Sequence, residues 1–296
     1  MPGSFYEFTT QILFPTVIFL VTFGMGLALT PRAFLDISKR PKVVLTGLAG
    51  QLILLPAVVF FFTMALNVPA PIAMGLILIA ACPGGSSSNA IVFAIRGELA
   101  LSVTLTAISS LCLLVTLPFW VKLGLLSYTP EDREVIVSAM EIVKRLLMVM
   151  ATPIALGMLI RHFRTDFAIR LHTPMRRLSL FLLLMIISVS IYNVRDFLTA
   201  AIYPIMLYSL AVASILIASA YLLPRFLSFR KGERLALAIE IGVQNTVLAI
   251  FVGASVLGWD ELTVTAIVYG LINYALIAGL IYLVKRQPQP LVVPAK

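Results

Sequence analysis

The sequence predicts an all-α integral membrane protein with about nine transmembrane helices. The chain has 296 residues, of which 60% are hydrophobic and 12% are charged, whereas a typical soluble domain carries about 25% charged residues. Its apolar runs are close to the roughly 20 residues that an α-helix needs to cross the hydrocarbon core of a bilayer. The connections between them are too short to hold a soluble domain, so we expect residues 1–296 to form one transmembrane domain embedded in lipid.

The nine expected spans follow one another with short connections. They cover residues 11–29, 43–66, 72–95, 99–125, 136–160, 177–194, 200–223, 233–257 and 262–284. We expect Pro56, Pro118, Pro153 and Pro204 to kink the helices that contain them, because each proline removes one backbone hydrogen bond. The proline-rich tail, residues 287–296, is expected to be disordered and cytoplasmic. The start of the chain lacks the basic segment of a signal peptide, so the first span is expected to remain in place.

The basic residues indicate the orientation of these spans. Seventeen of the 22 Lys and Arg fall on one side of the expected topology, and most acidic residues of the connections fall on the other side. By the positive-inside rule, the N-terminus is then external and the C-terminus cytoplasmic. We expect the protein to lie in the inner membrane of a bacterium.

Two other functional classes fit the sequence poorly. The net charge of +9 is spread over many connections and forms no basic face of the kind that binds nucleic acid. An intramembrane enzyme would need a nucleophile with a base, or a metal set. His162 and His172 instead lie in a basic connection, and Cys82 and Cys112 lie in separate spans without metal spacing. We therefore expect neither a nucleic-acid partner nor enzymatic activity, and no obligate protein partner is predicted.

The third span is interrupted near its middle by the sequence ACPGGSSSNA, residues 81–90. Pro83 cannot donate a backbone hydrogen bond, and the glycine pair 84–85 lets the chain leave helical geometry. Serines are good caps for a new helix, so we expect a second half-helix at about 87–95. Its positive end would stabilise an anion near the centre of the membrane. The alternative is a kinked helix whose serines only cap their own backbone.

Neutral oxygens lie next to this interruption and on the following span. Ser88 and Asn89 offer side-chain oxygens that suit a hard cation such as sodium. Ser102 and Thr106 are four residues apart in the span 99–125, so they share one helical face. Such a hydroxyl pair equally serves as ordinary contact between helices.

The eighth span is interrupted by EIGVQNTVLA, residues 240–249. Glu240 places a carboxyl group in an apolar run, where it is costly unless it is paired or functional. The nearest preceding basic residue is Arg234, near the expected cytoplasmic end, so a bound ion or a proton is the expected partner. Gln244 and Asn245 add amide groups. The alternative is a protonated carboxyl group that is hydrogen-bonded between helices.

Interruptions in both halves of a membrane protein are typical of inverted-repeat transporters, whose substrate site lies between the repeats. The first repeat would cover about 11–126 and the second about 136–285. Gln51 and Asn273 are isolated amides in the second and ninth spans, and each needs a partner across the bundle or a ligand.

Four segments together resemble the bile acid:sodium symporter family, which includes bacterial and plastid carriers of smaller organic anions. They are GMGLAL (24–29) with Pro31, Phe34 and Lys42, then CPGGSSSN (82–89), RGELALSVTLT (96–106) and EIGVQNTVLA (240–249). This resemblance implies a panel domain and a core domain in which two discontinuous helices cross. It also implies that two sodium ions are bound behind a crevice between the domains.

The resemblance also implies a role for each polar position. The first sodium would be held by Ser88, Asn89, Ser102, Thr106 and Glu240. The second would be held by the side chains of Gln51, Glu240 and Gln244 and by the backbone carbonyls of Ile241 and Val243. Ser86 and Ser87, at the start of the half-helix, would face the substrate together with Asn245 and Asn273.

We therefore expect a secondary transporter that couples inward sodium movement to import of an organic anion by alternating access. Some bacterial relatives have ten spans, whereas nine are expected here. The His-Asn pair of some relatives reads Ile272-Asn273 in this chain, which favours a small carboxylate over a bile acid. Proton coupling, sodium/proton antiport and a passive channel are the alternatives.

Overall fold

The computed structural model describes residues 7–29, 40–128, 138–193 and 195–286, and every regular element in them is helical. The all-α prediction is therefore confirmed. Six of these helices are long and apolar enough to cross a membrane: Phe8–Ala28, Pro41–Ala65, Leu99–Tyr128, Ala139–Phe163, Thr199–Arg225 and Glu261–Tyr282. Ala70–Ala80 and Thr246–Val256 are shorter apolar helices. The chain is thus a multi-pass membrane protein.

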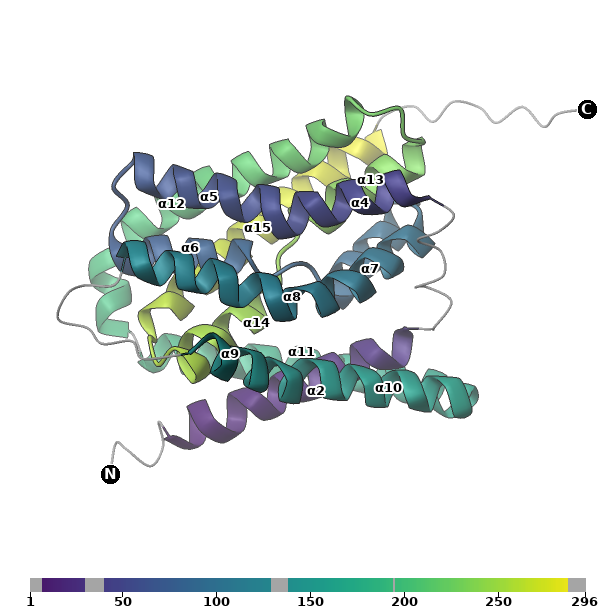
Figure 1. The fold of residues 1–296 in the computed structure, drawn as a ribbon, viewed down its shortest axis with the longest axis horizontal. Helices are drawn as coiled ribbons and strands as arrows, with labels where there is room; N and C mark the ends of the chain where they lie inside the picture. The colour runs from purple at the N-terminus through teal and green to yellow at the C-terminus, as the bar shows by residue number, and fades with distance from the viewer. Residues whose placement is uncertain (1–6, 30–39, 129–137, 194, 287–296) are drawn as a thin grey trace, which may run out of the picture.

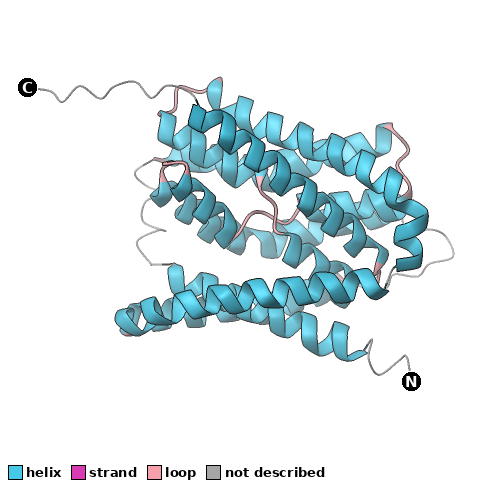
Figure 2. Ribbon diagram, turned by 180° about the vertical axis from the view of Figure 1, so that it is seen from behind, coloured by secondary structure: helices cyan, strands magenta, loops and turns pink. Residues whose placement is uncertain are grey.

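The helices form two layers, which Figures 1 and 2 show from opposite sides. The small layer consists of η1 (Phe8–Leu13), α2 (Phe14–Ala28), α9 (Ala139–Leu146), η4 (Leu147–Ala151), α10 (Thr152–Phe163) and α11 (Thr165–Asn193). Its helices pack closely: a Cβ added at Gly26 of α2 would collide with the carbonyl oxygen of Ile154 in α10. The Thr22 hydroxyl also donates to the carbonyl oxygen of Val149 at 2.8 Å.

The large layer contains the remaining elements. They are α4 (Pro41–Ala49), η3 (Gly50–Leu54), α5 (Leu55–Ala65), α6 (Ala70–Ala80), α7 (Ser86–Ala94), α8 (Leu99–Tyr128), α12 (Arg195–Leu222), η5 (Leu223–Arg225), α13 (Lys231–Gly242), α14 (Thr246–Phe251), η6 (Val252–Val256) and α15 (Glu261–Arg286). In α6 every residue from Ile72 to Ala80 is buried, as expected for a helix that is apolar on all sides. Among the described residues, Trp259, Tyr269 and Phe251 are the largest aromatic side chains that are fully buried in this layer.

Three prolines follow directly on π-helical turns. Pro15, Pro56 and Pro153 stand in the first turn of α2, α5 and α10, and η1, η3 and η4 end just before those helices begin. A proline ring clashes with the carbonyl group one turn earlier, and a wider π-turn accommodates it without ending the helix. Pro118 and Pro204 lie inside the continuous helices α8 and α12.

One expected connection is largely helical. Residues 161–176 were expected to be a connection between the spans 136–160 and 177–194, but α10 continues to Phe163 and α11 begins at Thr165. Arg and Lys are good helix formers, so a drop in hydropathy marks the edge of the apolar stretch and does not end the helix. Arg32, Lys39, Glu131, Asp132 and Glu134 and the tail 287–296 lie outside the described residues.

Candidate functional site

The helix that begins at Ala70 is interrupted where the sequence predicts it. α6 ends at Ala80, and α7 begins at Ser86 after the segment 81–85. The restart differs in one detail from the expectation that serines cap it. Gly85 is the N-cap residue, no side chain caps the helix, and the Ser88 hydroxyl donates to the carbonyl oxygen of Gly85 at 2.6 Å. Glycine is itself a favoured N-cap residue, so α7 needs no serine side chain at that position.

The second interruption separates α13 from α14. α13 ends at Gly242, and Asn245 caps α14 by accepting a hydrogen bond from the backbone nitrogen of Leu248 at 3.2 Å. Both predicted breaks are therefore present in the structure.

The two interruptions lie against each other. Pro83 and Gln244 form an isolated antiparallel β-bridge, and the backbone nitrogen of Asn245 donates to the carbonyl oxygen of Cys82 at 2.9 Å. The close approach requires glycine at position 84, because a Cβ there would lie 2.8 Å from the carbonyl oxygen of Val243. Segments about 160 residues apart in the sequence thus satisfy each other's backbone groups, as buried backbone requires.

Glu240 is the centre of a group of buried oxygens. Its Oε1 accepts a hydrogen bond from the Ser102 hydroxyl at 2.6 Å, and its Oε2 accepts one from the Thr106 hydroxyl at 3.0 Å. The Asn89 side-chain oxygen lies 2.6 Å from Ser102 Oγ and 3.5 Å from Thr106 Oγ1. Glu240, Ser102 and Thr106 are all 0% exposed. The prediction that Ser102 and Thr106 share a face is confirmed, and both hydroxyls point at the carboxyl group.

The two hydroxyl groups of this cluster contact more oxygens than they have hydrogens to donate. Each hydroxyl has a single hydrogen to donate, yet Ser102 and Thr106 each contact two oxygens. Within the described part of the chain, neither Lys nor Arg forms an ion pair with Glu240. Clustered oxygens around an uncompensated carboxyl group are the donor set that a hard monovalent or divalent cation prefers.

Gln51 and Gln244 contribute further buried polar atoms. Gln51 is fully buried in η3, and neither of its amide atoms has a hydrogen-bond partner among the described residues. Gln244 donates from Nε2 to the carbonyl oxygen of Ile241 at 3.0 Å, while its Oε1 has no partner in the same part of the chain. η3 packs on α13 at this point, since a Cβ on Gly50 would lie 2.7 Å from the end of the Ile241 side chain. Buried polar atoms without partners are costly unless a ligand satisfies them.

The residues predicted to face a substrate lie around the same breaks. Ser86 and Ser87 begin α7, and the Ser87 hydroxyl lies 3.2 Å from the hydroxyl of Tyr274. Asn273 is 2% exposed, and its amide nitrogen lies 2.9 Å from the carbonyl oxygen of Gly242 and 3.3 Å from the hydroxyl of Tyr269. In this structure Asn273 therefore supports the end of α13, and a contact with substrate stays a prediction.

Some residues of this region could not be predicted from the sequence. Tyr269 and Tyr274 in α15 reach Asn273 and Ser87, but an aromatic residue in an apolar span gives no signal of its partner. Arg40, Glu98 and Glu233 form an ion-pair cluster at one end of the large layer. They were read only as orientation signals or left unassigned, because their proximity depends on three helices far apart in the sequence.

A buried carboxyl group among oxygens in a multi-pass membrane protein is typical of the ion sites of transporters. The profile of the Sodium Bile acid symporter family matches residues 15–201, and the chain belongs to that family. The resemblance inferred from the sequence motifs is thereby confirmed.

Several proteins are similar to this chain over most of its length. The uncharacterized sodium-dependent transporter YocS of Bacillus subtilis is 30% identical over 249 residues, which are 82% of this chain and 74% of YocS. The probable sodium/metabolite cotransporter BASS2, chloroplastic, of Oryza sativa is 28% identical over 80% of this chain and 55% of its own length. The P3 protein of Mus musculus is 26% identical over 84% and 52%. The chain thus spans about half the length of the plant and mouse relatives.

Proposed function

We propose that this protein is a sodium-coupled symporter that imports an organic anion by alternating access. The observation that carries the proposal is the buried Glu240 carboxyl group, which contacts Ser102 and Thr106 and lies beside Asn89 without an ion-pair partner in the described chain. A monovalent cation would neutralise this charge and be coordinated by the same oxygens. Membership of a sodium symporter family supports sodium as that cation.

Two ion positions share the carboxyl group in this proposal. Ser88, Asn89, Ser102, Thr106 and Glu240 form the first. Gln51, Gln244 and Glu240, with the carbonyls of Ile241 and Val243, form the second. The second is supported by the unpartnered amide atoms of Gln51 and by the unpartnered Oε1 of Gln244. A bound cation would satisfy the oxygens of both amides at once.

The arrangement of the layers supports alternating access. All proposed ligands lie on η3, α7, α8 and α13 or in the break after α13, and thus in the large layer. The small layer supplies none of them. The large layer would be the core domain and the small layer the panel domain. The core would carry the bound ions and move as a unit against the panel. The two broken helices, α6–α7 and α13–α14, would cross at the bridge between Pro83 and Gln244.

We further propose nine membrane spans with an external N-terminus in a bacterial inner membrane. The helix ends that carry Arg40, Arg96, Arg164, Arg230 and Lys231 lie together on the right of Figure 1. Glu141 and Asp260 belong to helix ends on the left. Basic residues gathered on one side favour that side as cytoplasmic.

The proposed substrate is a small organic carboxylate. It would bind where α7 begins, because the free backbone N–H groups and the dipole of a helix start favour an anion. Ser86, Ser87, Asn245 and Asn273 surround the two breaks and would contact it. Ile272 stands where some relatives have histidine, which removes one polar group that a bile acid would use.

The test is a thermal-stability screen of the purified protein with organic anions, in sodium chloride and in potassium chloride of equal concentration. A ligand that binds only the folded state raises the apparent stability. The proposal predicts stabilisation by sodium alone, and further stabilisation by at least one carboxylate only when sodium is present. Stabilisation that follows pH and ignores sodium would favour the proton-coupled alternative.

A further inference from the structure

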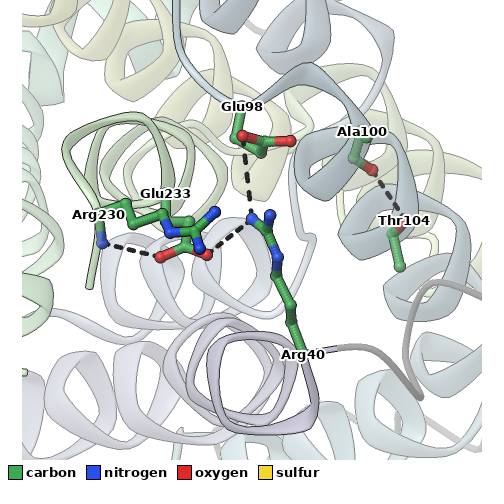
Figure 3. A network of polar contacts seen from close by, with 6 residues as sticks. All are labelled: Arg40, Glu98, Ala100, Thr104, Arg230 and Glu233. Atoms are coloured by element: carbon green, nitrogen blue, oxygen red, sulfur yellow. Dashed lines mark hydrogen bonds and ion pairs between the residues drawn. The ribbon is translucent and has the colours of Figure 1, made fainter. Parts of the chain in front are cut away.

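A compact ion-pair cluster joins three helices at one end of the large layer (Figure 3). Arg40 precedes α4, and its Nη1 lies 2.8 Å from Oε1 of Glu233 in α13 and 3.9 Å from Oε2 of Glu98 beside α8. The other carboxylate oxygen of Glu233 accepts a hydrogen bond from the backbone nitrogen of Arg230 at 2.8 Å. One guanidinium group therefore faces carboxylates from two other segments.

Because Glu233 is buried, its carboxylate requires Arg40 as its ion-pair partner. The Glu233 side chain is 6% exposed, whereas those of Arg40 and Glu98 are 38% and 40% exposed. A carboxylate that is almost completely removed from water is strongly unfavourable without a cation and donors. Arg40 is the cation, and its position is thereby fixed relative to the first turn of α13.

The backbone reinforces the same junction. The backbone nitrogen of Glu98 donates to the carbonyl oxygen of Gly232 at 3.0 Å, and the backbone nitrogen of Ser102 donates to the carbonyl oxygen of Glu98 at 3.1 Å. The short connection from α7 to α8 is thus bonded directly to the start of α13. Glu98 precedes Ser102 by one helical turn, and Glu233 precedes Glu240 by about two turns of one helix.

Each segment that meets at the cluster continues into a proposed sodium ligand. α4 leads to Gln51, α8 carries Ser102 and Thr106, and α13 carries Glu240. A small rotation or slide of α13 would separate Glu240 Oε1 from Ser102 Oγ, which are 2.6 Å apart. Metal affinity depends strongly on outer groups that hold the ligands in place.

We propose that Arg40, through Glu233 and Glu98, is a positioning residue that sets the sodium affinity of the transporter by holding α4, α8 and α13 in register. This inference rests on the proposed function, because it assigns a role to Arg40 only if the oxygens around Glu240 bind sodium. Arg40 itself touches neither the ion nor the substrate.

The test measures the sodium concentration that half-saturates the purified protein, obtained by fitting its thermal stabilisation over a series of sodium concentrations. Arg40→Gln is expected to raise that concentration about tenfold, which corresponds to about 1.4 kcal/mol of binding free energy, while high sodium still stabilises the variant. The exchanged pair Arg40→Glu with Glu233→Arg restores the ion pair but removes the carboxylate that accepts from the Arg230 backbone nitrogen, so it is expected to return only part of the affinity. A role in folding alone would lower stability equally at every sodium concentration and leave the half-saturating concentration unchanged.

The matched control is Glu141→Gln. Glu141 and Arg145 also pair at 2.8 Å, but both side chains are about half exposed and lie on α9, which carries no proposed ligand. This variant is expected to keep the wild-type half-saturating concentration. A wild-type protein that ignores sodium would refute the proposed function, whereas wild-type affinity in Arg40→Gln would overturn only the role of Arg40.

If Arg40→Gln gives no folded protein, two milder variants test whether the cluster sets the sodium affinity. Arg40→Lys keeps the charge but loses the planar geometry of the guanidinium group, and Glu98→Gln alters an exposed member of the cluster. Both are expected to weaken sodium binding by a smaller factor than Arg40→Gln. Unchanged sodium affinity in both would overturn the inference.

Discussion

The backbone nitrogen of Asn245 donates a 2.9 Å hydrogen bond to the carbonyl oxygen of Cys82. With the neighbouring bridge between Pro83 and Gln244, this bond makes each helix break the partner of the other. Backbone groups at membrane depth must be satisfied within the protein, so neither break can relax alone. Ligands that flank both breaks are consequently held as one group.

Gly84→Ala tests this pairing. The added Cβ would lie 2.8 Å from the Val243 carbonyl oxygen, and such overpacking costs about 1–3 kcal/mol. We expect a lower unfolding temperature and weaker sodium binding, because the breaks must separate. Gly279→Ala is the control, since the same substitution in α15 meets nothing within 4 Å. Equal unfolding temperatures and sodium affinities for the two variants would contradict the prediction.

Ser102→Ala tests the oxygen group around Glu240. The substitution removes the hydroxyl that lies 2.6 Å from both Glu240 and Asn89, and a hydrogen bond to a charged group contributes about 1.5–3 kcal/mol. We expect the half-saturating sodium concentration to rise at least tenfold.

The control for this variant is Thr104→Ser on the same helix. Within the residues that the structure describes, the Thr104 hydroxyl bonds to the carbonyl oxygen of Ala100 alone, at 2.8 Å, so removing the threonine methyl group leaves the proposed ligands unchanged. Sodium affinity should stay at the wild-type value in Thr104→Ser. A Ser102→Ala protein that responds to sodium like the wild type would exclude Ser102 as a ligand.

Gln51→Leu should preserve or raise the stability of the sodium-free protein but reduce the stabilisation that sodium provides. Both amide atoms are buried without partners, so replacing the amide by an apolar group of similar size removes a desolvation cost and leaves no partner unpaired. We expect the sodium-free protein to be as stable as the wild type or more stable. Its stabilisation by sodium should be reduced.

Ser209→Ala provides the comparison for Gln51→Leu. Ser209 is likewise buried without a partner in the described part of the chain, but it lies in α12, which carries no proposed ligand. Its removal should leave the response to sodium intact. Destabilisation of Gln51→Leu in the absence of sodium, with normal sodium binding, would mean that Gln51 is structural.

Much of this architecture could be predicted from local sequence. The Pro83-Gly84-Gly85 run cannot continue a helix, and Glu240 in an apolar run requires a partner. Both signals act within a few residues, so the breaks fall where they were expected. The helical spacing of Ser102 and Thr106 likewise predicted that both hydroxyls share a face.

Contacts between distant segments could not be predicted in this way. The serines were expected to cap α7, but Gly85 does so, and glycine competes well at that position. The bond of Asn273 to the Gly242 carbonyl oxygen and the Arg40–Glu233 pair depend on how α15, α4 and α13 pack. A single sequence contains no local pattern for such packing.

The most direct test of the central claim is equilibrium binding of radioactive sodium to the purified wild-type protein and to Glu240→Gln, with Glu141→Gln as the control. Glu240→Gln keeps the size of the side chain but removes the charge that the ion would neutralise. We predict saturable binding to the wild type and to Glu141→Gln, approaching two ions per chain, and no saturable binding to Glu240→Gln. Wild-type binding by a folded Glu240→Gln protein, or no binding by the wild type, would contradict the account.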